Sequence, residues 1–213
     1  MVKVIAVNFN YTPNWLFNFT DDFLIYDRSD SKEHLKEFPQ EKIIYTENKG
    51  NVDYDKLNYL IENYENLPDS FLWIKTNLFK YISPEEFQIL KYNASFTPLL
   101  TKNHLTYTDS EGWVNYYQDG IYWERNNSWY LGSVPAKNVS NFNEWCNLHN
   151  LTNNLSYIPF APGGNYILTK ETVHKYPKEY YMNMAKMLPY TQEPGEAHMA
   201  ERSYYLMWGQ PIW

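Results

Sequence analysis

The chain has 213 residues with 25 acidic and 18 basic side chains, and its formal net charge of -7 excludes the basic surface typical of nucleic-acid-binding proteins. Its single cysteine, Cys146, excludes an internal disulfide framework and a cysteine-based zinc site, and is typical of a reducing compartment such as the cytoplasm. No apolar run approaches the roughly 20 residues that a membrane-spanning helix needs, so we expect no membrane span.

Four short apolar segments near the start of the chain predict buried β-strands, because each is rich in β-branched or aromatic residues and ends in polar ones. They span residues 2–7, 22–26, 42–45 and 71–74. Residues 53–64 carry apolar side chains at helical spacing, with Asp53 as the expected N-cap, and Ser83-Pro84 begins a second helix. The alternation of strands and helices predicts an α/β fold with a central, mostly parallel sheet flanked by helices.

The second half of the chain has a different pattern. Residues 98–132 are rich in tyrosine and tryptophan and contain turn signals, which predicts β-hairpins or long loops. Beyond them we expect a helix, a strand, a helix that kinks or breaks at Pro177, and a last helix, at residues 141–151, 157–168, 171–187 and 194–208. The sequence shows neither an internal repeat nor a linker, so we expect one domain over residues 1–213, with halves at 1–97 and 98–213.

Polar residues follow each of the four predicted strands. They are Asn8, Asp27, Asn48 with Lys49, and Lys75 with Thr76 and Asn77. Ligands of open α/β sheets bind outside the carboxyl ends of the strands, so these side chains are candidates for contacts with a phosphate, a ribose or a base. Each of them taken alone is explained equally well by an ordinary turn, a helix cap or a surface position.

The last predicted helix begins with a second candidate group. Glu196 lies in its first turn, where the helix dipole stabilises a carboxylate, and where a general base could also be held. His198 shares a helix face with Glu201 and Arg202. An ordinary cluster of helical ion pairs accounts for these residues as well as a site does.

Five stretches of the sequence resemble one known family. They are NKG at residues 48–50, YLIENYENLPD at 59–69, FLWIKTNLFKY at 71–81, FAPGGNYILTKETVHKYPKEYY at 160–181 and GEAHMAERSYYLMWG at 195–209. Together they resemble α/β proteins related to the GT-A glycosyltransferases, which carry similar ENYDNLPD and ERLW segments. The length and layout are also similar to an N-terminal glycosyltransferase domain of large DNA viruses that modifies a capsid glycoprotein. The resemblance implies a single GT-A-like domain.

The resemblance further implies that the N-terminal half binds a nucleotide-sugar, a UDP-sugar, over the carboxyl ends of its strands. By position, Asn8 and Asp27 would contact the nucleoside and Lys49 the phosphates. The remaining residues expected to bind the nucleotide-sugar are Asn48, Lys75, Thr76 and Asn77. The loop-rich C-terminal half would bind a glycan or glycoprotein acceptor.

For the C-terminal half, the resemblance implies contacts to the transferred sugar or to the acceptor from Gly163, Gly164, Asn165, His198 and Arg202. Inverting GT-A enzymes often place their base in a Gly-Glu-Asp pattern at the start of a late helix. Gly195-Glu196 matches the first two positions, but Ala197 replaces the aspartate. Glu196 is therefore the first candidate for the base, and Glu201 is the second.

The main departure from the family concerns a metal ion. Most GT-A enzymes end the strand that corresponds to residues 71–77 in Asp-x-Asp, which holds Mn²⁺ or Mg²⁺ against the diphosphate, but here the segment is Thr76-Asn77-Leu78. The resemblance therefore implies a weakly bound divalent cation with Asn77 as its protein ligand, or charge neutralisation by Lys75 and Lys49.

From these features we expect a glycosyltransferase of the hexosyl or deoxyhexosyl class that moves a sugar from a UDP-sugar to a glycan. The aromatic segment 107–130 would present ring faces to the acceptor. The alternative is a non-catalytic sugar- or nucleotide-sugar-binding module on the same scaffold. A catalytic protein should retain a carboxylate near the anomeric carbon, and slow hydrolysis of the donor distinguishes the two classes.

Overall fold

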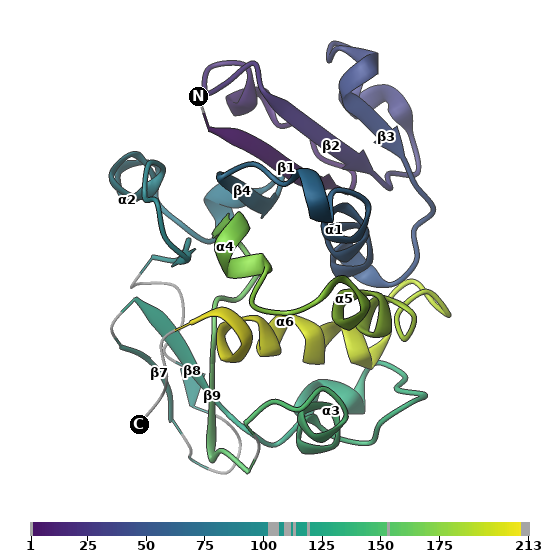
Figure 1. Cartoon of the computed structure of the whole chain (residues 1–213), viewed down its shortest axis with the longest axis vertical. Coiled ribbons are helices and arrows are strands. Elements are labelled where there is room, and N and C mark those ends of the chain that lie inside the picture. The colour runs from purple at the N-terminus through teal and green to yellow at the C-terminus, as the bar shows by residue number, and fades with distance from the viewer. Residues whose placement is uncertain are drawn as a thin grey trace.

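The computed structural model describes residues 2–101, 107–108, 112, 114–118, 120–152 and 154–209 (Figure 1). Its main element is a six-stranded sheet with the order β3-β2-β1-β4-β10-β5. The strands are β1 (Lys3–Asn8), β2 (Phe23–Asp27), β3 (Ile43–Tyr45), β4 (Ser70–Lys75), β5 (Thr97–Pro98) and β10 (Tyr166–Thr169). Strands β1 to β4 pair in parallel, whereas β10 runs antiparallel to both of its neighbours. The predicted α/β fold with a mostly parallel sheet is confirmed.

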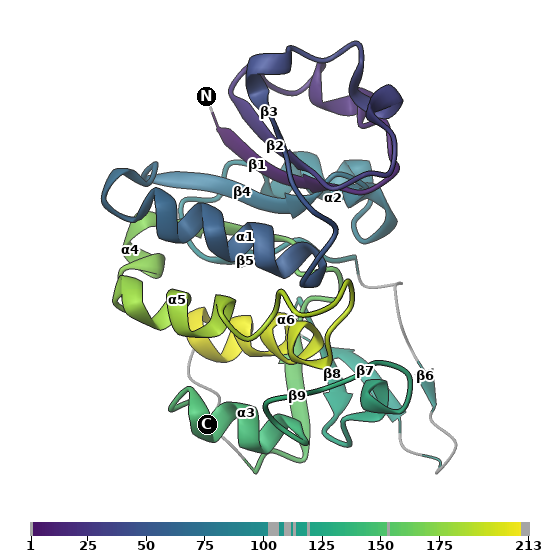
Figure 2. The same ribbon diagram turned by 90° about the vertical axis from the view of Figure 1, so that its right-hand side faces the viewer.

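Helices cover both faces of this sheet, which explains why its strands are apolar on both sides. One face packs against α1 (Asn51–Glu62) and α6 (Gly195–Trp208), and α5 (Lys178–Ala185) packs against α1 on its far side, as Figure 2 shows. The other face packs against α2 (Pro84–Leu90) and short 3-10 helices, among them η1 (Asn14–Leu16), η2 (Lys32–Leu35) and η5 (Leu78–Lys80). The remaining 3-10 helices of the described residues are η3 (Gln40–Lys42), η4 (Tyr64–Asn66) and η7 (Trp129–Gly132).

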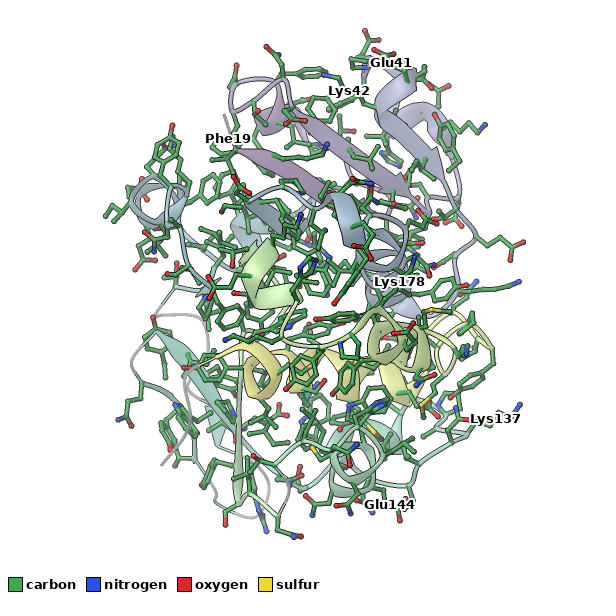
Figure 3. All side chains as sticks on the ribbon, viewed as in Figure 1. Phe19, Glu41, Lys42, Lys137, Glu144 and Lys178 are labelled. Atoms are coloured by element: carbon green, nitrogen blue, oxygen red, sulfur yellow. The ribbon has the colours of Figure 1, made fainter. Side chains whose placement is uncertain are left out.

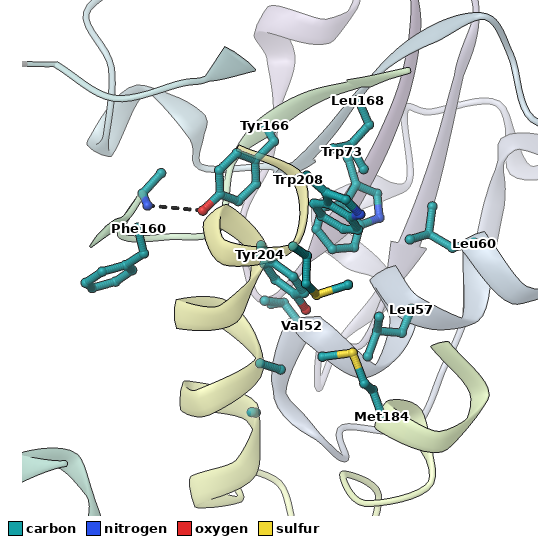
Figure 4. Close-up of a cluster of buried hydrophobic side chains, with 14 of the residues drawn as sticks. Val52, Leu57, Leu60, Trp73, Phe160, Tyr166, Leu168, Met184, Tyr204 and Trp208 are labelled. Atoms are coloured by element: carbon teal, nitrogen blue, oxygen red, sulfur yellow. Dashed lines mark hydrogen bonds between the residues drawn. The ribbon is translucent and has the colours of Figure 1, made fainter. Parts of the chain in front are cut away.

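The larger core cluster packs on both sides of α6, and Figure 4 shows mainly its part between α6 and the main sheet. Its centre is aromatic: the rings of Tyr204 and Trp208 stack 5.2 Å apart, and Trp73 of β4 meets both of them edge-on. Tyr166 packs beside them, and its hydroxyl accepts a hydrogen bond from the N–H of Ala161 at 3.1 Å. Part of the high tyrosine and tryptophan content is therefore used for the core.

A second, four-stranded sheet lies on the far side of α6. It has the antiparallel order β6-β7-β8-β9, with β6 (Tyr107–Thr108), β7 (Val114–Gln118), β8 (Ile121–Arg125) and β9 (Tyr157–Phe160). The helix α3 (Phe142–Leu148) packs against α6 on the same side. The hairpins expected between residues 98 and 132 include β7 and β8; parts of that prediction, at 102–106, 109–111, 113 and 119, lie outside the described residues.

The break expected at Pro177 is confirmed, because residues 171–187 form two helices, α4 (Lys170–Val173) and α5, which are separated there. Two other expectations for individual elements are corrected by the structure. The single strand expected over 157–168 is two strands, β9 and β10, which belong to different sheets. Asp53 is not an N-cap: α1 begins earlier, after the left-handed Gly50 (φ +70°), and Asp53 is buried in its first turn.

The two halves of the chain share the main sheet, because β10 comes from the second half and pairs with β4 from the first. Among the described residues, none of the helices has the length and apolar character needed to cross a bilayer.

Candidate functional site at the carboxyl edge of the sheet

The carboxyl ends of β1, β2 and β4 meet at a chain of buried polar side chains. The Thr76 hydroxyl donates a hydrogen bond to Asn8 Oδ1 at 2.6 Å, and Asn8 Nδ2 donates one to Asp27 Oδ1 at 3.0 Å. Strand β2 lies next to β1 on one side and β4 lies next to it on the other, so the strand order reverses direction at β1. This reversal is a topological switch point, where open α/β sheets bind their ligands. The structure thus brings three of the predicted residues together.

Asp27 retains an unused acceptor in this group. Its Oδ1 accepts hydrogen bonds from Asn8 and from the Ser29 hydroxyl, the latter at 2.6 Å. Its Oδ2 is buried and has no hydrogen-bond partner within the described chain. A buried carboxylate oxygen without a partner is costly, so it is a candidate acceptor for a ligand hydroxyl or N–H.

Arg28, which the sequence analysis did not single out, lies beside Asp27 and is also buried. Its Nη2 donates to the carbonyl oxygen of Lys49, and its Nη1 lies 3.8 Å from Asp55 Oδ2. Burial lowers the pKa of Arg28, although the charges of Asp55 and Asp53 oppose this shift. Burial likewise raises the pKa of Asp55 to about 6, against the effect of Arg28. In the sequence, the only indication that Arg28 belongs to this group is its position just after a predicted strand.

The turn that joins the two sheets brings a further group to the same edge. Gly163 (φ +89°) and Gly164 (φ +62°) adopt left-handed conformations that favour glycine. A Cβ on Gly163 would lie 2.7 Å from the ring of Tyr81, so the turn also needs the small residue for packing. Directly after it, Asn165 Oδ1 accepts a hydrogen bond from the Lys75 N–H at 2.7 Å, while its buried Nδ2 has no partner in the described structure.

Next to this turn lies a partly exposed ion pair. Lys75 Nζ is 3.7 Å from Glu201 Oε1, and the two side chains are 19% and 13% exposed. Burial alone would raise the pKa of Glu201, but the positive charges of Lys75 and Arg202 outweigh it and lower that pKa. Glu201 is therefore an ionised carboxylate that solvent can reach, on the side of α6 that faces Lys75.

A second lysine lies behind this pair, fully buried. Lys56 Nζ donates a hydrogen bond to the Gly164 carbonyl oxygen and lies 4.7 Å above the Trp73 ring. Burial lowers the pKa of Lys56 to about 7, with a further contribution from Lys75 and opposition from Asp53. The sequence contained a signal for this burial, because Lys56 lies four residues from both Val52 and Leu60 on the apolar stripe of α1.

Glu196, the first candidate for the base, has a different environment. Its Oε1 accepts hydrogen bonds from the backbone N–H groups of Lys137 and Asn138, at 2.8 and 2.7 Å, and its Oε2 accepts one from the Tyr190 hydroxyl at 2.6 Å. Burial alone would raise the pKa of Glu196, but these hydrogen bonds outweigh it and lower that pKa. The side chain of Lys137 points outward from this loop (Figure 3). Glu196 thus fixes a surface loop to the start of α6.

The other predicted residues are spread over the molecule. Lys49 is exposed and pairs with Glu47 in solvent, and Asn48 beside it is only partly buried. Asn77 is at the strand end, with a buried Oδ1 that lacks a hydrogen-bond partner in the described chain. His198 stacks on Tyr130 at 5.3 Å.

Arg202 faces the second sheet. Its Nε and Nη2 donate to the two carboxylate oxygens of Glu124 at 2.6 and 3.0 Å, which makes a buried bidentate ion pair. Its Nη1 also lies 3.7 Å from Glu201 Oε2. Arg202 therefore joins Glu201 to β8, and its own donors are largely occupied by protein.

The donor set at the edge does not fit a resident divalent cation. Across the described ranges, no three His, Cys, Asp or Glu side chains are grouped so that they could hold a metal. The atoms nearest the end of β4 are the neutral oxygens of Thr76 and Asn77 and the cationic Lys75. Mn²⁺ and Mg²⁺ prefer carboxylate oxygens, and a neighbouring ammonium group repels them.

The sheet and the polar groups at its switch point define an α/β protein with a cluster of buried polar side chains at the carboxyl edge of its parallel strands. Residues 13–212 match the family described as "Protein of unknown function (DUF3431)", and the chain therefore belongs to this family. A search of the curated proteins finds no match.

Proposed function

We propose that the protein is a glycosyltransferase that moves a sugar from a UDP-sugar to a glycan or glycoprotein, with the donor bound at the carboxyl edge. The proposal depends mainly on one observation, a group of buried polar atoms there that lack hydrogen-bond partners in the described chain: Asp27 Oδ2, Arg28 Nε and Nη1, Asn77 Oδ1 and Asn165 Nδ2. Buried polar atoms are nearly always hydrogen-bonded, so their concentration at a switch point supports a polar ligand.

In this proposal the nucleoside lies over β1 and β2 and the diphosphate over β4. Asp27 Oδ2 accepts a hydrogen bond from the ribose or the base. Lys75 is the partly exposed cation of the group and neutralises the diphosphate as a point charge. Lys49, which is paired with Glu47 in solvent, has a smaller part than the sequence suggested.

The proposed reaction is displacement at the anomeric carbon. The acceptor hydroxyl oxygen forms a bond to that carbon, the bond to the diphosphate oxygen breaks, and the electron pair leaves with the nucleoside diphosphate. Glu201 takes the proton of the acceptor hydroxyl, because its lowered pKa keeps it ionised and it is accessible. Lys75 stabilises the charge on the leaving diphosphate. The geometry favours Glu201 over Glu196, whose oxygens are occupied by the 137–138 loop.

The lack of a carboxylate pair at the end of β4 favours one alternative, a non-catalytic module that binds nucleotide-sugars. Both functions place the same donor at the same edge. They differ in whether Glu201 acts on a bound acceptor or only pairs with Lys75. The single buried Cys146 suits the cytoplasm, the compartment we propose for either function.

The test is a calorimetric titration of UDP, GDP and CMP and of their sugar conjugates, followed by an assay for slow hydrolysis of whichever conjugate binds. A glycosyltransferase binds one of them and releases free sugar, and Glu201→Gln retains binding while it loses that release. Binding without hydrolysis in the wild type identifies the non-catalytic module. Absence of binding by every nucleotide and conjugate overturns the assignment of the edge.

A further inference from the structure

The further inference concerns Trp129, at the start of η7 on the opposite side of α6 from the main sheet. Most aromatic side chains described between residues 114 and 130 are used for packing: Tyr116 stacks on Trp123 at 6.0 Å, and Tyr122 and Tyr130 are buried. Trp129 differs, because 59% of it is exposed. Exposure of so much apolar ring surface to water is unfavourable, so the contacts that hold this ring at the surface are of interest.

The exposed indole is held in one orientation. Trp129 Nε1 donates a hydrogen bond to Glu124 Oε1 at 3.1 Å, and the same carboxylate forms the buried bidentate pair with Arg202. The polar end of the ring is therefore satisfied and fixed by buried groups, while the ring face remains in solvent. A preorganised aromatic face loses little conformational entropy when a ligand stacks on it.

The backbone before Trp129 also departs from relaxed geometry. Ser128 adopts a left-handed conformation (φ 50°, ψ 34°), which is uncommon for a residue other than glycine. Its hydroxyl accepts a hydrogen bond from the Phe142 N–H at 3.0 Å, which fixes the turn to α3. Strained conformations that the surroundings hold in place are concentrated at functional sites.

The same ion pair connects the indole to the proposed base. Arg202 follows Glu201 directly on α6, and its Nη1 lies 3.7 Å from Glu201 Oε2. Two side chains, Arg202 and Glu124, therefore link Glu201 to Trp129 through consecutive polar contacts.

We propose that Trp129 is the stacking platform for a neutral carbohydrate acceptor, an inference that rests on the proposed transferase function. The apolar C–H face of a pyranose ring packs on an aromatic face. Glu124, which holds the indole, is neutralised by Arg202, so this pair offers no net charge to an anionic sugar. The Glu124–Arg202 pair orients the platform relative to Glu201.

The experiment compares Trp129→Ala and Trp129→Phe with Tyr92→Ala, which removes another exposed ring (69% exposed) from the region after α2. Titrations of cellotetraose, maltotetraose and chitotetraose, followed by ligand-observed NMR, report acceptor-side binding without any donor. We expect Trp129→Ala to weaken binding of at least one of them by about tenfold, Trp129→Phe to restore most of it, and Tyr92→Ala to have no effect.

The donor side separates this inference from the proposed function. In Trp129→Ala the KM for the donor should remain at the wild-type value, because the donor edge is formed by other residues, while the KM for the acceptor rises. Unchanged oligosaccharide affinity and acceptor KM in Trp129→Ala, or no binding of any of the three probes to the wild type, overturns the platform even if donor hydrolysis is intact. If Trp129→Ala unfolds by circular dichroism, Trp129→Phe tests the platform through a smaller loss of affinity, because it keeps an aromatic face but lacks the N–H that donates to Glu124.

Discussion

Lys56 Nζ donates a hydrogen bond of 2.6 Å to the carbonyl oxygen of Gly164, although 108 residues separate the two in the chain. This bond joins helix α1 to the turn between β9 and β10. Lys56 is fully buried, and its described side-chain hydrogen bond goes to this carbonyl oxygen and not to a carboxylate. The main structural role of its amino group is therefore to hold the turn. Such a position is rare for lysine.

This burial predicts that stability depends on pH. The pKa of Lys56 is about 7 in the folded protein and 10.5 as the ordinary value, so the unfolded chain binds more protons between these limits. The contribution to stability is therefore fully present above pH 10.5 and is lost as the pH falls toward 7. From pH 7 to pH 9, the free energy of unfolding of the wild type should rise by about 2–3 kcal/mol relative to Lys56→Met in urea denaturation. Lys36→Met, at an exposed lysine, is the control, and parallel curves for Lys56→Met and wild type would contradict the prediction.

The two carboxylates of α6 should respond in opposite ways to substitution. Glu201→Gln keeps the shape of the side chain but removes the proton acceptor, so transfer should fall roughly 10²–10⁴-fold while the melting temperature changes little. Glu196→Ala leaves the N–H groups of the 137–138 loop without their acceptor, so it should cost about 1–3 kcal/mol of stability while the folded protein remains active. Transfer at the wild-type rate in Glu201→Gln would remove Glu201 from the mechanism.

Two glycines with similar backbone angles form a matched pair. Gly163 and Gly112 have φ of +89° and +82°, so alanine is strained at both, at a cost of about 1–2 kcal/mol. At Gly163 the new Cβ would also lie 2.8 Å from Asn165 Nδ2 and 2.7 Å from the Tyr81 ring, whereas at Gly112 it would meet none of the described residues within 4 Å. Gly163→Ala should therefore cost a further 1–3 kcal/mol, roughly, in thermal or urea unfolding, and equal losses at both positions would be inconsistent with this packing.

Asp27 should determine donor affinity through its unused oxygen. Asp27→Asn replaces an acceptor by an amide and disturbs the bond from Asn8, so we expect nucleotide binding to weaken by about 1–3 kcal/mol in calorimetry. Asp30→Asn is the control, because Asp30 is exposed and contacts only the end of the β1–η1 loop through Asn10. Equal affinities for the Asp27→Asn and wild-type proteins would show that the nucleoside does not contact Asp27.

The donor atoms at the end of β4 predict weak binding of free metal. Titration of Mn²⁺ into the protein alone should give no saturable heat at millimolar concentrations, because Thr76 and Asn77 supply only neutral oxygens next to Lys75. With UDP-sugar present, the diphosphate itself should bring modest joint binding. Lys75→Ala should reduce donor affinity more than Asn77→Ala, because a charge near a diphosphate is worth more than a neutral hydrogen bond. Tight binding of Mn²⁺ without nucleotide would refute this description of the edge.

Much of the fold was predictable because its main strands are buried on both faces. The segments of β1, β2, β3 and β4 are short apolar runs with polar ends. In a chain that alternates strands and helices, this pattern is typical of strands in a parallel sheet. The break at Pro177 and the start of α2 at Ser83-Pro84 follow from local backbone chemistry. The separation of β9 from β10 was missed, since local patterns do not tell which sheet a strand joins.

The site was less predictable, because it depends on contacts between distant segments. A carboxylate at the start of a helix looks the same in sequence whether it binds a loop, as Glu196 does, or faces a crevice. Burial of Arg28 and Lys56 runs against the average behaviour of charged residues, and only the packing of α1 and α6 around them makes it tolerable. The orientation of the exposed Trp129 ring was likewise not predictable from its own segment, because it depends on the ion pair between Glu124 and Arg202.

The position of β10 between β4 and β5 has a consequence for biosynthesis. Both neighbours precede it in the chain, and β5 pairs in the main sheet only with β10. While a ribosome is still making residues 100–160, β5 has no partner strand and one edge of β4 is unpaired. Unpaired strand edges can pair with those of other nascent chains and so favour aggregation. The sheet closes only when the last quarter of the chain has emerged, so slow, non-local closure late in translation should dominate the folding time of this protein.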